Sequence, residues 1–145
     1  MKYLVFDTET TGLLDFKRPA HEDGQPRLAH VNMIACDAAG TAIRVQDMLI
    51  RPDETWTAKD FADLESPSNP NPLTRERLEA EGVPIADVLD CYSEAVTDHG
   101  LILVAHNVQF DAKMMRAELR RANRDDLFDR SPNICTMRGM AKIIG

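Results

Sequence analysis

The sequence predicts a single α/β domain built on a mixed sheet, and three observations lead to this prediction. A short apolar run at residues 3–6, rich in aromatic and branched side chains, is typical of a buried strand. A second continuous apolar run at 101–105 follows an amphipathic helical pattern. The predicted elements then follow the order β-β-β-α-α-β-α-β-α, which favours a layered sheet-and-helix fold.

The first half of the chain carries the predicted antiparallel strands. Residues 14–29 are polar and contain Pro and Gly, so we expect a loop. Two strands are expected at 30–37 and 42–50, joined by a turn at 38–40. One slip in the apolar alternation of the later strand is typical of a β-bulge. Together with the first strand they predict an antiparallel three-stranded unit.

The middle of the chain is rich in proline. Residues 52–72 contain four prolines and are expected to be mostly irregular, with Trp56 and Phe61 holding them to the core. Thr74 is a good N-cap for a short helix that ends before Gly82.

The second half alternates helices and strands. A helix after Pro84 has apolar residues at spacings of three, four and seven. The buried strand at 101–105 precedes a helix from 107 to 122. A short fifth strand is expected at 133–136, followed by a helix over 137–144.

Composition sets limits on the kind of protein. The chain has 145 residues, of which 43% are hydrophobic and 28% are charged, as in ordinary globular domains. No segment has the apolar length needed to span a bilayer, so no membrane partner is expected. Three widely spaced cysteines predict neither a disulfide framework nor a zinc site, which fits a reducing cytoplasm.

A net charge of −7 is unusual for a protein that binds nucleic acid. Metal ions held by local carboxylates can supply the missing positive charge. Such a protein would bind nucleic acid with modest, salt-sensitive affinity.

Two carboxylates stand at the end of the first strand. Because side chains alternate along a strand, Asp7 and Glu9 are expected to point to the same side, away from Thr8. Adjacent anionic groups repel each other unless a cation lies between them, and hard divalent ions prefer carboxylate oxygens. The alternative is an Asp-x-Glu pair in a solvated turn.

A third carboxylate, Asp111, lies in the first turn of the helix after the buried strand at 101–105. The positive end of the helix dipole is expected to hold it ionised. If this strand pairs with the first strand, then Asp7, Glu9 and Asp111 meet at one edge of the sheet, where ligands bind in α/β folds.

Two strings in the sequence resemble the motifs of a known superfamily. Phe-Asp-Thr-Glu-Thr-Thr-Gly-Leu at 6–13 and His-Asn-x-x-Phe-Asp at 106–111 are similar to motifs of the DEDD 3′–5′ exonucleases. The nearest likeness is to the epsilon-type proofreading subunit of bacterial DNA polymerase III and its stand-alone bacterial and phage relatives. The resemblance implies an RNase H-like fold, with a mixed five-stranded sheet flanked by helices.

The resemblance also implies an activity. It implies hydrolysis of phosphodiester bonds at the 3′ end of single-stranded DNA or RNA by two ions of Mg²⁺ or Mn²⁺. Asp7, Glu9 and Asp111 would be the metal ligands and catalytic carboxylates. A polymerase or a second copy of the chain would be a further partner.

The substrate-binding residues implied by the resemblance lie in the same two strings. Stacking on aromatic faces would hold the terminal base without reading its sequence. For His106 the alternative is a structural histidine that caps the helix, and for Asn107 it is an N-cap. Arg116, Arg120 and Arg121 are expected to form a solvated helix face rather than to guide phosphates. The implied set is Thr10, Thr11, Gly12, Leu13, His106, Asn107 and Phe110.

The third motif of the superfamily, which supplies a fourth carboxylate and the general base, has no counterpart after Asp111. We therefore expect residues 1–145 to form one exonuclease-like domain that is truncated at its C-terminus and lacks a C-terminal helix. General-base catalysis contributes roughly 10²–10⁴-fold, so impaired activity is expected. Part of the sheet face would be left uncovered.

Two other functions compete with this one. A non-catalytic module could keep the fold only to bind nucleic acid or a polymerase. A phosphatase of the haloacid dehalogenase type also begins with a strand and an acidic motif. However, Glu9 stands where that motif has an aspartate, and no lysine motif follows.

Overall fold

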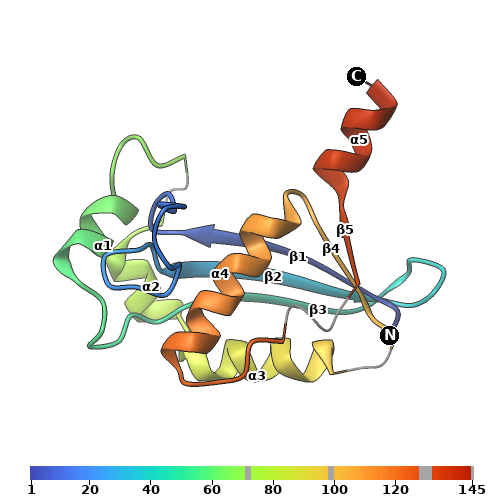
Figure 1. Cartoon of the computed structure of the whole chain (residues 1–145). Coiled ribbons are helices and arrows are strands. Elements are labelled where there is room, and N and C mark those ends of the chain that lie inside the picture. Colours follow the sequence, from blue (N-terminus) through green and yellow to red (C-terminus); the bar gives the residue numbers. More distant parts are fainter. Residues whose placement is uncertain (71–72, 98–99, 128–131, 145) are drawn as a thin grey trace.

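A computed structural model of the chain describes residues 1–70, 73–97, 100–127 and 132–144. Five strands form one sheet in the order β3-β2-β1-β4-β5, and the helices flank it (Figure 1). The fold class predicted from the sequence is thus confirmed. The elements in chain order are β1 (Tyr3–Thr10), β2 (Leu28–Cys36), β3 (Ala42–Leu49), α1 (Ala58–Leu64), α2 (Arg75–Glu81), α3 (Ile85–Val96), β4 (Ile102–Ala105), α4 (Val108–Arg121), β5 (Asn133–Cys135) and α5 (Thr136–Ile144).

The sheet is mixed. β1, β2 and β3 pair antiparallel, as predicted, while β4 runs parallel to both β1 and β5. The register between β2 and β3 shifts at Ala35/Cys36 and leaves Ile43 of β3 without a partner, in the strand where a bulge was expected. A second shift, at Glu9/Thr10, was not predicted. β4 pairs only with Tyr3–Val5 of β1. The carboxyl-terminal half of β1 therefore extends past the end of β4.

One face of the sheet carries the core. Along β1 the side chains of Leu4, Phe6 and Thr8 are buried, and α4 contacts β1, β2 and β4 on this side. Tyr92 of α3 is fully buried, and the centroid of its ring lies 5.9 Å from the centroid of the Phe6 ring. Burial of this apolar surface contributes roughly 25 cal/mol per Å².

The opposite face carries a row of aliphatic residues, one from each strand. Residues paired across neighbouring strands lie on the same face, so the register aligns Val45, Ile34, Val5, Val104 and Ile134. Val45, Val5 and Ile134 are 61%, 37% and 46% exposed. This "aliphatic row" agrees with the expectation of an uncovered sheet face.

Some local details differ from the predictions. The proline-rich stretch is mostly irregular, as expected, but it also contains α1, which was not predicted and which begins with a capping box between Thr57 and Asp60. β2 begins two residues earlier than predicted, because the buried Glu118 carboxylate accepts a hydrogen bond from the backbone N–H of Leu28. Ile43 is 57% exposed on the edge strand β3.

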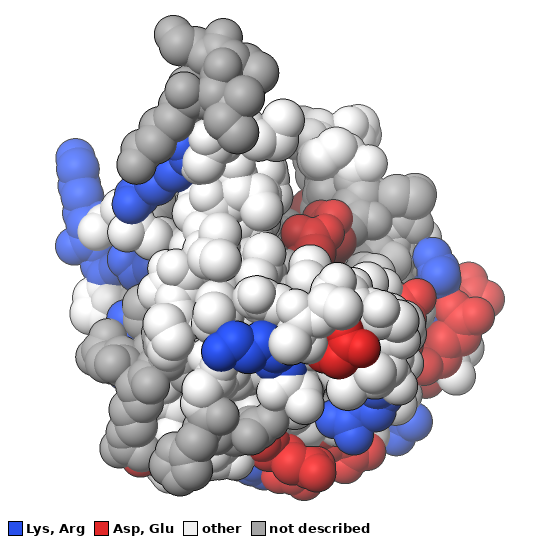
Figure 2. All heavy atoms as spheres, turned by 90° about the vertical axis from the view of Figure 1, so that its right-hand side faces the viewer, with Lys and Arg blue, Asp and Glu red and all other residues white. Residues whose placement is uncertain are grey.

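Charge is dispersed over the surface seen from the right-hand side of Figure 1. In this view the Lys and Arg side chains are separated by uncharged and acidic residues (Figure 2). In the described part of the chain, no helix has the length and apolar character required to cross a membrane.

Candidate nucleic-acid-processing site

The alternation of β1 separates its side chains as the sequence predicts. Thr8 points toward the core face and is buried, whereas Asp7 is exposed and Glu9 is half-buried. Because β4 ends at the level of Val5, this part of β1 has a free edge on the β4 side. The edge leaves the backbone N–H of Thr8 available for a side chain from another element.

Asp111 of α4 occupies that edge. Its Oδ1 accepts a hydrogen bond from the Thr8 backbone N–H at 3.1 Å and another from the Thr8 hydroxyl at 2.6 Å. Asp111 is only 3% exposed. It is therefore bound to the residue that lies between Asp7 and Glu9, and the three carboxylates share one end of β1.

The pKa of Asp111 is raised to about 6, chiefly by burial. Its hydrogen bonds from Thr8 lower the pKa, while the negative charges of Asp7 and Glu9 raise it further. Desolvation outweighs the helix dipole at this position, but a carboxyl with a pKa of about 6 is still mainly ionised at pH 7. Asp111 is therefore held in place by hydrogen bonds from Thr8 and is repelled by the negative charges of Asp7 and Glu9.

The residues before Asp111 do not cap α4 with their side chains. Asn107 takes the N-cap position, as the alternative interpretation predicts, at φ 70°, but its side chain makes no capping hydrogen bond. The exposed ring of His106 lies beside α5, with Nδ1 3.1 Å from the Thr136 hydroxyl. His106 therefore does not cap α4 either, and it stands at the junction of β4, β5 and α5.

A cavity of about 540 Å³ opens beside Glu9, and neither Asp7 nor Asp111 is among its lining residues. Leu13 is 93% exposed at its rim, and Phe110 enters it from the first turn of α4. Of the residues predicted to bind substrate, Thr10, Thr11, Gly12, Leu13 and Phe110 line this cavity together with Glu9.

Two of the predicted residues also have structural contacts. The Thr10 hydroxyl donates to the Gly12 carbonyl at 2.7 Å. Thr11 is buried, and its hydroxyl accepts from the backbone N–H of Arg27 at 2.9 Å. The Thr11 side chain thus holds the segment after β1 in place. Because this side chain is buried, Thr11 would contact a ligand through its backbone.

The opposite wall of the cavity was not predicted from the sequence. This wall comes from α1 and the loop that follows it, and it places an ion pair between Lys59 and Asp63 opposite Gly12. The Thr57-x-x-Asp60 capping pattern was the signal that could have revealed α1. The residues of this wall are Lys59, Asp63, Ser66, Ser68, Asn69 and Pro70.

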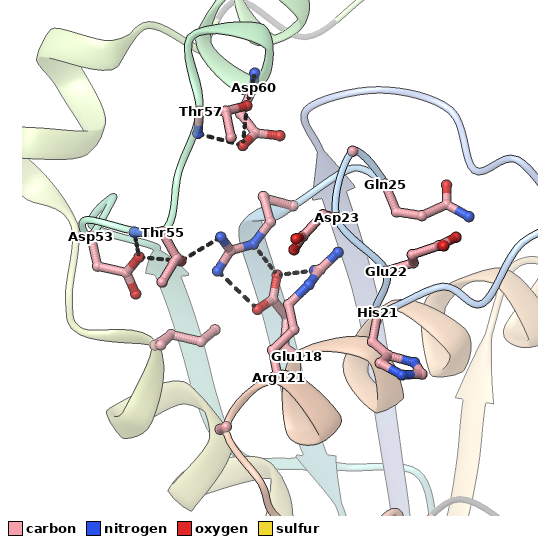
Figure 3. A pocket seen from close by; sticks show the side chains of 14 residues that line it. His21, Glu22, Asp23, Gln25, Asp53, Thr55, Thr57, Asp60, Glu118 and Arg121 are labelled. Atoms are coloured by element: carbon pink, nitrogen blue, oxygen red, sulfur yellow. Dashed lines mark hydrogen bonds and ion pairs between the residues drawn. The ribbon is translucent and has the colours of Figure 1, made fainter.

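A buried ion cluster fixes α4 two turns beyond Asp111 (Figure 3). Glu118 accepts from Arg27 Nε at 3.1 Å, from Arg121 Nη1 at 3.0 Å and from the Leu28 backbone N–H at 3.1 Å. The prediction that Arg121 is solvated was wrong, because its guanidinium also donates to the Ala20 and Pro26 carbonyls. The cluster joins α4 to the start of β2 and to the loop before it.

The donor set at the end of β1 fits a hard divalent cation in chemistry. It consists of carboxylates, and the charges of Asp7 and Glu9 add to the effect of burial in raising the pKa of Asp111, so a cation would relieve their repulsion. Both hydrogen bonds from Thr8 to Asp111 use Oδ1. Within the described ranges, no three His, Cys, Asp or Glu side chains are already gathered closely enough to hold a metal ion.

Comparison with known proteins gives a structural match only. Neither a family model nor a curated protein sequence matches the chain. E. coli exonuclease I in complex with a dT13 oligonucleotide is similar with a TM-score of 0.73 and 18% identity, covering 95% of this chain and 28% of that one. A product-bound structure of exonuclease I has a TM-score of 0.72 at 19% identity, covering 95% and 30%.

A zinc-bound form of the E. coli exonuclease I–single-stranded DNA complex also matches, with a TM-score of 0.72 at 18% identity, covering 95% and 28%. The chain thus spans less than a third of the length of these matched proteins. At such low identity the likeness shows the fold, and it gives no particular support to the epsilon-type subfamily. The chain has the RNase H-like fold of exonuclease I.

Proposed function

We propose that residues 1–145 form one domain of a metal-dependent 3′–5′ exonuclease acting on single-stranded DNA. The observation that carries this proposal is the hydrogen bonding of Asp111 to Thr8, between Asp7 and Glu9. It brings two acidic segments, far apart in sequence, to one strand edge beside an open cavity. The structural likeness to exonuclease I, solved with DNA oligonucleotides, supports DNA over RNA as the substrate.

Asp7, Glu9 and Asp111 would hold Mg²⁺ or Mn²⁺. When bound, two such ions would supply an activated water and stabilise the leaving 3′ oxygen. The cavity lined by Thr10, Gly12 and Phe110 would seat the terminal nucleotide against the carboxylates. Phe110 offers its ring to the base, a contact that tolerates any sequence.

This chain is expected to be a slow catalyst. No histidine or tyrosine follows His106 in the sequence, so the usual general base of the superfamily has no counterpart here. Loss of general-base catalysis costs roughly 10²–10⁴-fold in rate. His106 is not among the residues that line the cavity, and it is hydrogen-bonded to Thr136.

A non-catalytic module that binds nucleic acid or a polymerase is the second candidate. The carboxylates are not gathered into a closed ligand set within the described residues, and this observation favours the module. The two candidates differ in their response to metal. A nuclease requires Mg²⁺ or Mn²⁺ for cleavage, whereas a binding module retains DNA without shortening it.

The test is digestion of a 5′-labelled single-stranded oligonucleotide with Mn²⁺, Mg²⁺ or EDTA. Stepwise shortening from the 3′ end that needs metal and disappears in Asp7→Asn would support the nuclease. Asp47→Asn is the matched control, because Asp47 is exposed on β3 and pairs with His30. Metal-independent binding without shortening, equal in the wild type and in Asp7→Asn, would favour the module. Release of phosphate from small phosphomonoesters would indicate a phosphatase.

A further inference from the structure

A second cavity, of about 260 Å³, lies along α4 away from the carboxylates. Its lining includes four cationic side chains, Arg18, Lys113, Arg116 and Arg120. Arg18 pairs with Glu22, while Arg116 and Arg120 both pair with Asp126. Among the described residues no ion pair involves Lys113. In a chain of net charge −7, this concentration of cations is unusual.

One face of α4 connects the two cavities. Phe110 lines the cavity beside Glu9, whereas Lys113 and Arg120 line the cationic one. The spacings of three and seven residues place these side chains on neighbouring positions of one helix face. At 1.5 Å per residue, the distance from Phe110 to Arg120 along the helix is about 15 Å.

An exposed aromatic ring lies beside this face. Phe16 is 70% exposed, and the Lys113 ammonium lies 5.0 Å from its ring centroid. A large exposed aromatic side chain next to a cation forms a surface on which a base can stack while its phosphate contacts the cation. On a solvated loop the same ring would lie over Lys113 without binding anything, and this is the alternative to be tested.

We propose that Phe16 and the Lys113–Arg120 face of α4 form a track for the strand upstream of the 3′-terminal nucleotide. The track rests on the proposed function, because the 3′ end must lie at the carboxylates for the upstream strand to follow α4. Its ligand is single-stranded DNA of any sequence, held by base stacking and phosphate charge. The track gives a net acidic protein a local cationic surface for a polyanion.

The experiment measures binding of 5′-fluorescein dT2 and dT12 by anisotropy in Ca²⁺ over a range of salt concentrations. Phe16→Ala should weaken dT12 binding by about fivefold or more, the lower end of the effect of losing one stacked base. Lys113→Gln should reduce the slope of log affinity against log salt by about one. Neither change should affect dT2, which is too short to reach the track.

Arg44→Gln is the matched control, because Arg44 is an exposed arginine on the edge strand β3. Equal affinity of wild type and variants for dT12, equal losses for dT2 and dT12, or no measurable dT12 binding by the wild type would each overturn the track. Hydrolysis of thymidine 5′-(p-nitrophenyl phosphate) tests the terminal site separately. If the variants lose affinity for dT12 and the wild-type chain does not hydrolyse this ester, the proposed track is supported and the proposed exonuclease activity is rejected.

Discussion

At the scale of single residues, the candidate site depends on a buried carboxyl with a raised pKa. The pKa of Asp111 is about 6 because burial disfavours its charged form and Asp7 and Glu9 add repulsion. An acid whose pKa is higher in the folded state than in the unfolded state stabilises the fold most at low pH. That stabilisation is lost as the pH rises through about 6.

We predict that Asp111→Asn stabilises the metal-free chain at pH 8. The amide keeps an oxygen that can accept from Thr8 and removes the buried negative charge. The shift of about two pKa units corresponds to roughly 3 kcal/mol, an upper limit for the gain. Urea unfolding in EDTA from pH 4 to pH 8 provides the measurement, and the advantage of the variant should appear between pH 4 and about 6 and then level off. A variant that loses relative stability over this pH interval would contradict the prediction.

Glu118 is the second residue on which the site depends. It receives hydrogen bonds from two arginines and a backbone N–H, so its removal leaves buried cations without their partner. We predict that Glu118→Gln lowers the free energy of unfolding by about 3–5 kcal/mol. Urea denaturation is the measurement. The matched control is Glu79→Gln, whose exposed pair with Arg75 should be worth under about 1 kcal/mol.

At the scale of elements, the sequence predicted best where the pattern is local. Strand alternation located Asp7 and Glu9, and helical spacing located α3 and α4. Prediction from the sequence failed where long-range contacts determine the bounds of a strand or the burial of a side chain. The start of β2 and the burial of Arg121 both depend on Glu118, which is about ninety residues away from Leu28. The raised pKa of Asp111 depends on its burial, which no local pattern reports.

The helix α1 was missed because four prolines obscured a clear start signal. Thr57 accepts from the Asp60 backbone N–H, and the Asp60 carboxylate accepts from the Thr57 backbone N–H. Because α1 forms one wall of the cavity beside Glu9, its cap is connected to the candidate site.

We predict that Thr57→Ala lowers the free energy of unfolding by about 0.5–2 kcal/mol through loss of the cap. Weaker binding of dT2 in the cavity should accompany this loss, whereas Thr74→Ala, which removes the cap of α2, should leave dT2 binding unchanged. Chemical denaturation and anisotropy measure the two effects. Equal effects of both variants on dT2 would show that α1 has no special connection with the cavity.

At the scale of the whole molecule, the two faces of the sheet differ in their cover. α3 and α4 bury the core face, while the aliphatic row crosses all five strands on the other face with three members well exposed. Strands lie about 4.8 Å apart, so the row extends about 20 Å. Contiguous apolar surface of this kind favours association in water.

We predict that the chain self-associates through the aliphatic row at micromolar concentration. The row is self-complementary, because two copies related by a two-fold axis along it would place identical branched side chains against one another. Replacing Val45 and Ile134 with Thr keeps branched, strand-forming side chains and makes both ends of the row polar. Sedimentation velocity should then show the double variant as a monomer where the wild type sediments faster. Ile43→Thr, at a similarly exposed residue of β3 outside the row, should sediment as the wild type does, and a monomeric wild type would exclude the row as an interface between copies.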